Sequence, residues 1–143
     1  MPFYIIRRRI RRIARRRRKA RKAPDRPDYL ARKESARQLA ISRLEYFASE
    51  YSKIDPSFAV SMKYNRVAIR NQRGRWGSCT SRRNLNFNYR ILDLAPELRD
   101  YIIVHELCHL KELHHGKAFW DLVSLAIPKA RELNRQARKM RIG

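Results

Sequence analysis

The amino-acid sequence predicts an α+β fold in which a small group of short strands lies between helices. Three observations predict it. Apolar residues recur every three or four positions between residues 28 and 52, apolar and polar residues alternate between residues 58 and 89, and a nearly continuous apolar segment follows Pro96. The 143 residues are the length of one ordinary domain, which can bury a core without disulfides.

The first helix is predicted to run from Asp28, a favourable N-cap, to about Ser52. One of its faces carries apolar residues at helical spacing, so this face is expected to pack against the rest of the fold. These residues are Ala36, Ala40, Leu44, Phe47 and Tyr51. Pro56 ends the helical region.

Short strands are predicted after this helix. Alternating apolar residues at 58–62 and again at 67–69 predict a hairpin. An extended segment at residues 75–80 then turns back into a strand at residues 84–89. In that last strand one face carries Leu85, Phe87 and Tyr89, and the other carries Asn84, Asn86 and Asn88.

Pro96, at a first-turn position, begins a second helix that is expected to run to about Leu113. This segment is apolar around most of its circumference, which predicts the buried central helix of the fold. Gly116 breaks the chain before a third helix at residues 117–127. Pro128 begins a polar last helix with a basic surface formed by Lys129, Arg131, Arg135, Arg138, Lys139 and Arg141.

The formal net charge of +22 is unevenly distributed along the chain. Residues 1–23 contain 12 Lys or Arg and no acid, which is more than half of the excess. Repulsion among these charges predicts a disordered basic tail. Its favoured partner is DNA or RNA, and the alternatives are an anionic membrane or a solvated tail without a specific partner. The expected nucleic-acid contacts are Arg7, Arg8, Arg9, Arg11, Arg12, Arg15, Arg16, Arg17 and Arg18. The remaining residues, 24–143, are expected to form the folded domain.

Several classes of protein are excluded by the sequence. There is no apolar run long enough for a membrane-spanning helix, and the short apolar start precedes the arginines instead of following them, unlike a secretory signal. Two cysteines do not make a disulfide framework. The expectation is a soluble cytoplasmic protein with reduced thiols, and no pattern indicates its oligomeric state.

The segment His105-Glu106-Leu107-Cys108-His109 fits the pattern H-E-x-x-H inside the predicted central helix. Residues four apart share a helix face, so both imidazoles can bind one metal ion. Glu106 lies about 100° further round the helix, where it can act as general base toward a water molecule that the metal activates. Cys108 lies on another face and is not expected to be a ligand. The pattern predicts a site for one Zn²⁺ ion.

A catalytic zinc ion needs a third protein ligand and an open position for water. His115 is our choice for the third ligand, because a chain leaving the helix near Leu113 can turn back toward it. His114 stays as the alternative. Glu112 lies on the same face as His105, where it either orients a histidine through its carboxylate or is a solvated residue at the end of the helix.

Together these motifs resemble those of the YgjP-like zinc metallopeptidases, relatives of the SprT-like and Wss-type proteases. The matching segments are residues 75–79, residues 84–88, and residues 105–109 followed by His115 and the pair Phe119-Trp120. The resemblance spans residues 60–133 and leaves the basic tail outside. It implies a minimal zincin-like fold, with a small mixed β-sheet packed on the active-site helix. It also implies that His105, His109 and His115 bind zinc and that Glu106 is the catalytic glutamate.

Weaker signals surround the motif. Trp76, Asn86 and Asn88 are candidates for the edge of a substrate cleft, where an extended peptide adds as a strand; the alternative is that Trp76 fills the core and the asparagines face solvent. Phe119 and Trp120 are expected to pack behind the metal site.

The leading functional hypothesis is a zinc-dependent peptidase that acts on proteins or peptides, near nucleic acid if the basic tail has the role expected of it. One alternative is a zinc-dependent endoribonuclease of the YbeY type, whose motif lacks a glutamate beside the first histidine. Another is a non-catalytic nucleic-acid-binding protein with a structural zinc ion. Three ligands and an intact Glu106 indicate an open site, which disfavours the structural role.

Overall fold

The structure, a computed structural model, describes residues 26–140 and 142. The chain divides into two compact units, Met1–Ala31 and Arg32–Gly143. Only residues 26–31 of the first unit are described, and they are the beginning of α2 (Arg26–Ile54). The predicted basic tail and its arginines lie outside the described residues.

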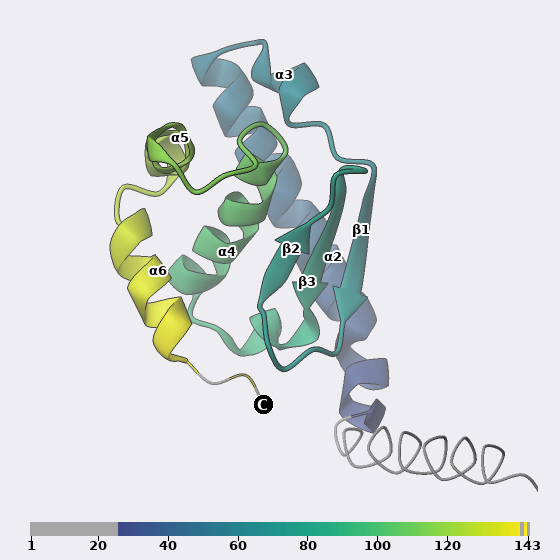
Figure 1. Cartoon of the computed structure of the whole chain (residues 1–143). Helices are drawn as coiled ribbons and strands as arrows, with labels where there is room; N and C mark the ends of the chain where they lie inside the picture. The colour runs from purple at the N-terminus through teal and green to yellow at the C-terminus, as the bar shows by residue number, and fades with distance from the viewer. Residues whose placement is uncertain (1–25, 141, 143) are drawn as a thin grey trace, which may run out of the picture. The chain divides into compact units, whose positions relative to one another are not determined.

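The second unit combines helices with one small sheet, as the sequence predicts (Figure 1). A short helix and the first strand follow α2, two more strands and a 3-10 turn come next, and three helices complete the chain. The bounds are α3 (Phe58–Ser61), β1 (Arg66–Arg70), β2 (Gly77–Cys79), β3 (Asn84–Asn88), η1 (Tyr89–Asp93), α4 (Pro96–His109), α5 (Lys117–Ala126) and α6 (Ala130–Lys139). Among the described helices, none is long and apolar enough to span a membrane.

The sheet is mixed and has the strand order β1-β3-β2. β1 pairs with β3 in parallel, with Val67 opposite Leu85, and β2 pairs with β3 in antiparallel, with Ser78 opposite Asn86. The predicted turn between the second and third strands is therefore present. β3 is the central strand, and β2 lies at an edge of the sheet.

One predicted strand is wrong. Residues 58–61 form the short helix α3, so the expected hairpin with residues 67–69 does not exist. The Asp55 carboxylate accepts a hydrogen bond from the main-chain N–H of Ser57 and so fixes a tight turn before α3. Phe58 and Met62 are buried while Val60 is 79% exposed. Burial four residues apart is the pattern of a helix, because alternation would have buried all three.

α4 is the central helix, as its apolar composition predicts. It packs against β2 and β3 on one side and against α5 and α6 on the other (Figure 1). Ile103, Val104 and Leu107 are fully buried in this contact. The apolar face predicted for α2 is buried as well, and Tyr51 on that face donates a hydrogen bond to the main-chain oxygen of Leu122 in α5.

Candidate metal centre

α4 carries two histidines on one face, at a point where the helix emerges from the core. The Nε2 atoms of His105 and His109 lie 3.1 Å apart. The neighbours Leu107 and Cys108 point into the core and are fully buried. The apolar faces of α4 thus fix the rotation of the helix, and this rotation brings both imidazoles to the same place.

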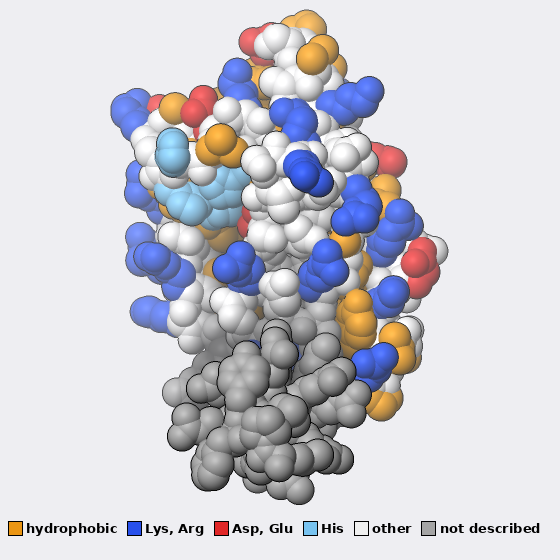
Figure 2. Space-filling view, turned by 45° about the vertical axis from the view of Figure 1, so that its right-hand side comes forward, with side chains coloured by type: hydrophobic (Ala, Val, Ile, Leu, Met, Phe, Trp, Pro, Cys, Tyr) orange, Lys and Arg blue, Asp and Glu red, His pale blue; other side chains and the backbone are white. Residues whose placement is uncertain are grey.

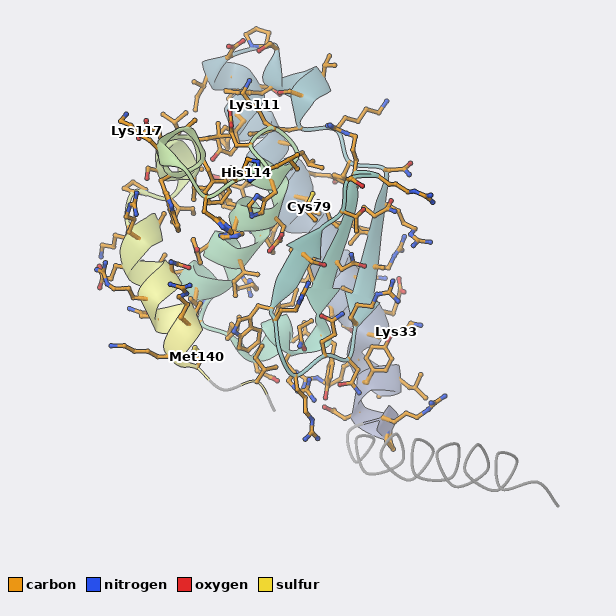
Figure 3. All side chains as sticks on the ribbon, viewed as in Figure 1. Lys33, Cys79, Lys111, His114, Lys117 and Met140 are labelled. Atoms are coloured by element: carbon orange, nitrogen blue, oxygen red, sulfur yellow. The ribbon has the colours of Figure 1, made fainter. Side chains whose placement is uncertain are left out.

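The third imidazole comes from the loop between α4 and α5. The main-chain N–H of Glu112 bonds to the carbonyl of Cys108, which tightens the end of α4 and turns the chain back. His115 Nε2 lies 3.0 Å from His109 Nε2 and 3.1 Å from His105 Nε2. His114 is exposed and does not belong to this cluster (Figure 3). Figure 2 shows histidine side chains gathered on one face of the molecule.

The three nitrogens fit a zinc ion. Zinc bound tetrahedrally to imidazole at about 2.0–2.1 Å places its ligand nitrogens roughly 3.3 Å apart, and here they are 3.0–3.1 Å apart. Three neutral nitrogen donors with an open fourth position are also a donor set that catalytic zinc sites use. His105, His109 and His115 are therefore the residues that could hold the metal.

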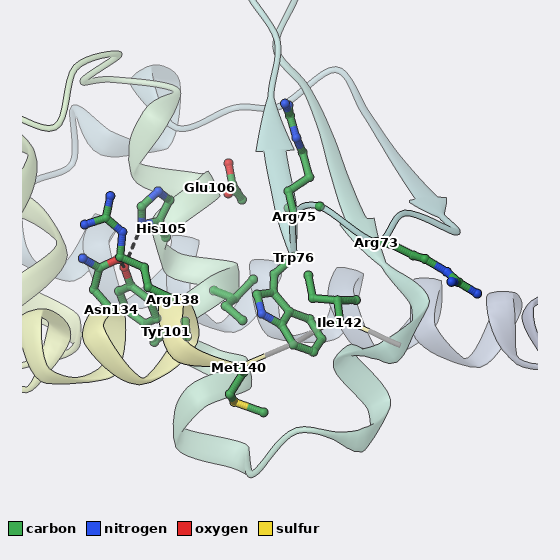
Figure 4. Close-up of a pocket in the computed structure, with 14 residues that line it drawn as sticks. Arg73, Arg75, Trp76, Tyr101, His105, Glu106, Asn134, Arg138, Met140 and Ile142 are labelled. Atoms are coloured by element: carbon green, nitrogen blue, oxygen red, sulfur yellow. Dashed lines mark hydrogen bonds between the residues drawn. The ribbon is translucent and has the colours of Figure 1, made fainter. Parts of the chain in front are cut away.

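Hydrogen bonds on the far side of two rings orient these nitrogens. His109 Nδ1 lies 3.0 Å from the carbonyl oxygen of Glu112, which can only accept, so Nδ1 carries the proton and Nε2 keeps its lone pair. The Tyr101 hydroxyl donates to Asn134 Oδ1 at 3.1 Å and so accepts from His105 Nδ1 at 2.9 Å (Figure 4). Both rings are thus held in the tautomer that a metal requires.

Burial keeps these two imidazoles neutral. It lowers the pKa of His105 to about 3, helped by the neighbouring His109 and His115. Burial also lowers the pKa of His109, while its bond to the carbonyl of Glu112 opposes that shift. A neutral imidazole is the form that binds metal, so neither ring has to lose a proton at neutral pH.

We expect Tyr101→Phe to weaken zinc binding by about 10- to 100-fold, the usual effect of removing a hydrogen-bond partner of a metal-binding histidine. The variant leaves His105 Nδ1–H without its acceptor and frees the ring to turn. Competition with a chromophoric chelator measures the dissociation constant. Tyr51→Phe is the matched control, because it removes the hydroxyl of a similarly buried tyrosine whose partners, Leu122 and Cys108, lie outside the cluster. Equal zinc affinity in both variants would contradict the role of Tyr101.

Phe119 packs behind the cluster, as predicted. Its ring stacks on His109 at a centroid distance of 4.5 Å and makes edge contacts with His105 at 4.9 Å and His115 at 5.0 Å. Phe119 is fully buried and Trp120 beside it is 9% exposed. One side of the three imidazoles is therefore closed by aromatic surface.

Glu106 lies beside the histidines and against the edge strand β2. A Cβ atom on Gly77 would sit 2.9 Å from Glu106 Cγ and 3.1 Å from the main-chain oxygen of Asn86, so only glycine allows this approach. Burial raises the pKa of Glu106 to about 8, and the positive charge of Arg75 opposes the shift. A cation held by the histidines would favour the ionised carboxylate. Such a group is suited to proton transfer near neutral pH.

The three residues predicted to border a substrate cleft do not lie together in the structure. Trp76 is half-buried and lines a cavity that also contacts His105 and Glu106 (Figure 4). Asn86 lies on the sheet face opposite α4, bonded to Ser78 and Arg70.

Asn88 is 1% exposed, and its amide bonds to main-chain atoms of Gln72, Arg75 and Arg90. The lining of the cavity beside His105 and Glu106 thus includes Trp76 but neither of these asparagines. β3 is central, with a neighbour on each side, so its asparagines do not border an open edge.

Several residues at the site were missed by sequence reasoning. Tyr101 could have been found, because it precedes His105 by one helical turn and shares its face. Glu112 was noted for its carboxylate, but it is its main-chain carbonyl that bonds to His109. Asn134 and Arg138 reach the site from α6, and no local pattern in the sequence places them there.

The two cysteines are unpaired thiols. Cys79, in β2, is half-buried, and burial with the nearby Glu106 raises the pKa of its thiol to about 11 (Figure 3). Cys108 is fully buried beside the Tyr51 hydroxyl, and burial raises its pKa to about 12. Cys108 lies outside the histidine cluster.

A sequence model of a family described as "YgjP-like, metallopeptidase domain" matches residues 5–140. This match includes most of the basic segment 1–23, which the resemblance drawn from motifs leaves out. No curated protein matches significantly. Among solved structures, the chain is similar to the metallopeptidase zymogen of Pyrococcus abyssi abylysin, with a TM-score of 0.49 and 24% identity over 75% of this chain and 93% of that chain.

Proposed function

The chain belongs to the YgjP-like metallopeptidase family, and we propose from this premise that it is a peptidase dependent on one zinc ion. His105, His109 and His115 hold the metal in this proposal, and Glu106 is the general base. The substrate is a protein or peptide. We also propose a cytoplasmic location, which the two free thiols support.

One observation carries the proposal. Three Nε2 atoms converge within 3.1 Å of one another, and the carboxylate of the residue next to His105 lies beside them at the wall of an open cavity. This combination of three nitrogens, one buried carboxylate and an accessible face is what hydrolysis at a metal requires.

Proton transfer is the part of the reaction that Glu106 performs. When bound, zinc supplies a Lewis acid that polarises the scissile carbonyl and makes a water molecule acidic. The Glu106 carboxylate accepts a proton from the attacking water and then delivers it to the nitrogen of the departing amine. Its burial against Gly77 holds the carboxylate in place and keeps its pKa close to neutral pH, where a group can both accept and donate a proton.

The edge of β2 supports binding of the substrate as an extended strand. The main-chain N–H of Asn88 bonds to the oxygen of Trp76, and the N–H of Thr80 bonds to the oxygen of Asn84. Because antiparallel pairs alternate, the main-chain groups of Gly77 and Cys79 point away from β3. A peptide could therefore pair with β2 directly beside Glu106, through hydrogen bonds that do not depend on its sequence.

The two alternatives are less well supported by the arrangement. An endoribonuclease of the YbeY type has no need of a glutamate beside the first histidine, whereas here Glu106 is buried at the site and Gly77 makes room for it. A structural zinc ion is normally enclosed by four protein ligands. In the described part of the chain, the cluster has three.

Assays of the purified chain on casein and on RNA test the proposed function. We expect zinc-loaded protein to cleave casein, a chelator to abolish the activity, and added zinc to restore it. RNA is expected to stay intact under all three conditions. Cleavage of RNA without cleavage of casein contradicts the proposal and favours the endoribonuclease.

The expected link to nucleic acid depends on the basic tail, residues 1–23, and remains part of the proposal. We expect removal of these residues to weaken DNA binding and to flatten its dependence on salt. A chain that makes fewer phosphate contacts releases fewer counterions when it binds. Binding measured between 50 and 200 mM salt gives the slope. Zinc content serves as the control for folding. An unchanged slope contradicts a role for the tail.

A further inference from the structure

A cavity of about 640 Å³ lies between α4, α6 and residues 73–77, directly beside the histidine cluster (Figure 4). His105 and Glu106 form part of its wall. Volumes in this range are typical of ligand sites and exceed what one side chain needs. A substrate that places its scissile bond at Glu106 would therefore direct a neighbouring side chain into this cavity.

The charged groups of the cavity are mainly cationic. Arg73, Arg75 and Arg138 line it, and Glu106 is the one carboxylate among its described lining residues. Arg75 precedes β2 and Arg138 lies in the last turn of α6, so the two guanidinium groups come from opposite walls with Glu106 between them (Figure 4). In the proposed function Glu106 transfers protons and does not serve as a partner for these arginines. The three arginines therefore give the cavity an excess of positive charge.

Arg75 and Arg138 are available to a ligand. Both side chains are exposed, and within the described residues neither forms an ion pair or a hydrogen bond with an acidic partner. Other arginines of the same unit do have such partners: Arg43 binds Asp100 through two hydrogen bonds. A guanidinium group binds a carboxylate or a phosphate through paired hydrogen bonds, and the anionic groups that the side chains of an unmodified peptide carry are the carboxylates of Glu and Asp.

Apolar groups complete the cavity. Trp76, Ile102 and Met140, the residue that follows α6, line it (Figure 4). Such surface accommodates the methylene groups of a side chain whose charged end reaches the arginines. A lysine or arginine side chain would meet like charge in the same place.

We propose that this cavity selects substrates that carry an acidic residue next to the scissile bond, with Arg75 and Arg138 binding its carboxylate. The inference rests on the proposed function and adds the substrate class. Arg75 and Arg138 determine specificity in it and take no part in the chemical step.

The test begins with the full zinc-loaded chain and a mixture of peptides from digested proteins. Mass spectrometry of the products identifies the residues that flank each cut. We expect enrichment of Glu and Asp at one position beside the cut. Synthetic peptides that differ only there, with Glu, Gln or Lys, then give the ratio of kcat/KM for Glu over Gln. We expect a ratio of about 10 or more, the usual effect of hydrogen bonds to a charged group.

Variants connect this preference to the two arginines. Arg138→Glu is expected to remove the preference for Glu and to favour the Lys peptide, and Arg75→Gln is expected to bring the Glu-to-Gln ratio close to one. The ratio cancels any general effect of Arg75 on Glu106. Arg135→Glu is the matched control, because it makes the same charge change one turn earlier on α6 at an exposed position that does not line the cavity. It should keep the wild-type ratio.

Three outcomes would overturn the inference. The first is cleavage without enrichment of acidic residues, and the second is a preference that survives both Arg138→Glu and Arg75→Gln. The third is enrichment of phosphorylated residues, or inhibition by a short oligonucleotide that Arg138→Glu abolishes, because either result would assign the cavity to phosphate. Absence of any peptide cleavage by the zinc-loaded wild type would instead contradict the proposed function itself.

Discussion

Glu106→Gln is expected to lower kcat/KM for peptide cleavage by about 100- to 10,000-fold, the contribution of a well-placed general base. Glutamine has the same shape, so it fits against Gly77 as glutamate does, but it cannot accept and return a proton. The metal-binding imidazoles are untouched, so zinc content should stay at the wild-type level. Steady-state kinetics with a peptide substrate and metal analysis of the same sample give both values.

Glu112→Gln is the matched control for this variant. It makes the same change at a half-buried glutamate near the same histidines, where the main-chain carbonyl and not the carboxylate bonds to His109. We expect it to keep both activity and zinc. Proteolysis that persists in Glu106→Gln would refute the role of Glu106. RNA cleavage that is equal in Glu106→Gln and the wild type would point to the alternative enzyme class.

Local patterns in the sequence predicted much of this site because the features concerned are local. The spacing of His105 and His109 and the apolar remainder of α4 lie within one helix, whose periodicity fixes both the shared face and the burial. The strict alternation of residues 84–88 likewise identified β3. Where one element determines the outcome, periodicity is sufficient evidence.

Features that depend on how one helix or strand packs against another were not predictable from local patterns. Alternation at residues 58–62 also fits a helix with two buried residues four apart, and the structure has this helix after a turn at Asp55. The sequence does not say which strand is central, so the asparagines of β3 were placed at an edge that belongs to β2. Arg138 and Asn134 reach the cavity only because α6 packs on α4.

His115→Ala is expected to weaken zinc binding on the order of 100-fold and to abolish peptidase activity, whereas His114→Ala should change neither. Adjacent in the sequence, the two residues differ in where the loop places them. His115 Nε2 lies 3.0 Å from His109 Nε2, and His114 is exposed outside the cluster. A 100-fold loss of affinity corresponds to about 2.8 kcal/mol, because each tenfold change in a dissociation constant is worth about 1.4 kcal/mol. Competition with a chelator and a peptide assay on both variants make the comparison.

The two variants make the same substitution at adjacent positions, so a difference between them reports where each imidazole lies. Both changes remove an exposed imidazole from the same loop, so any general effect on the loop or on surface charge should be common to the two. His115 also contacts Phe119 at a centroid distance of 5.0 Å, and His115→Asn keeps a polar side chain there while supplying a poorer ligand. Loss of zinc in His114→Ala with retention in His115→Ala would reverse the assignment of the third ligand. Retention in both would contradict His115 as a required third ligand.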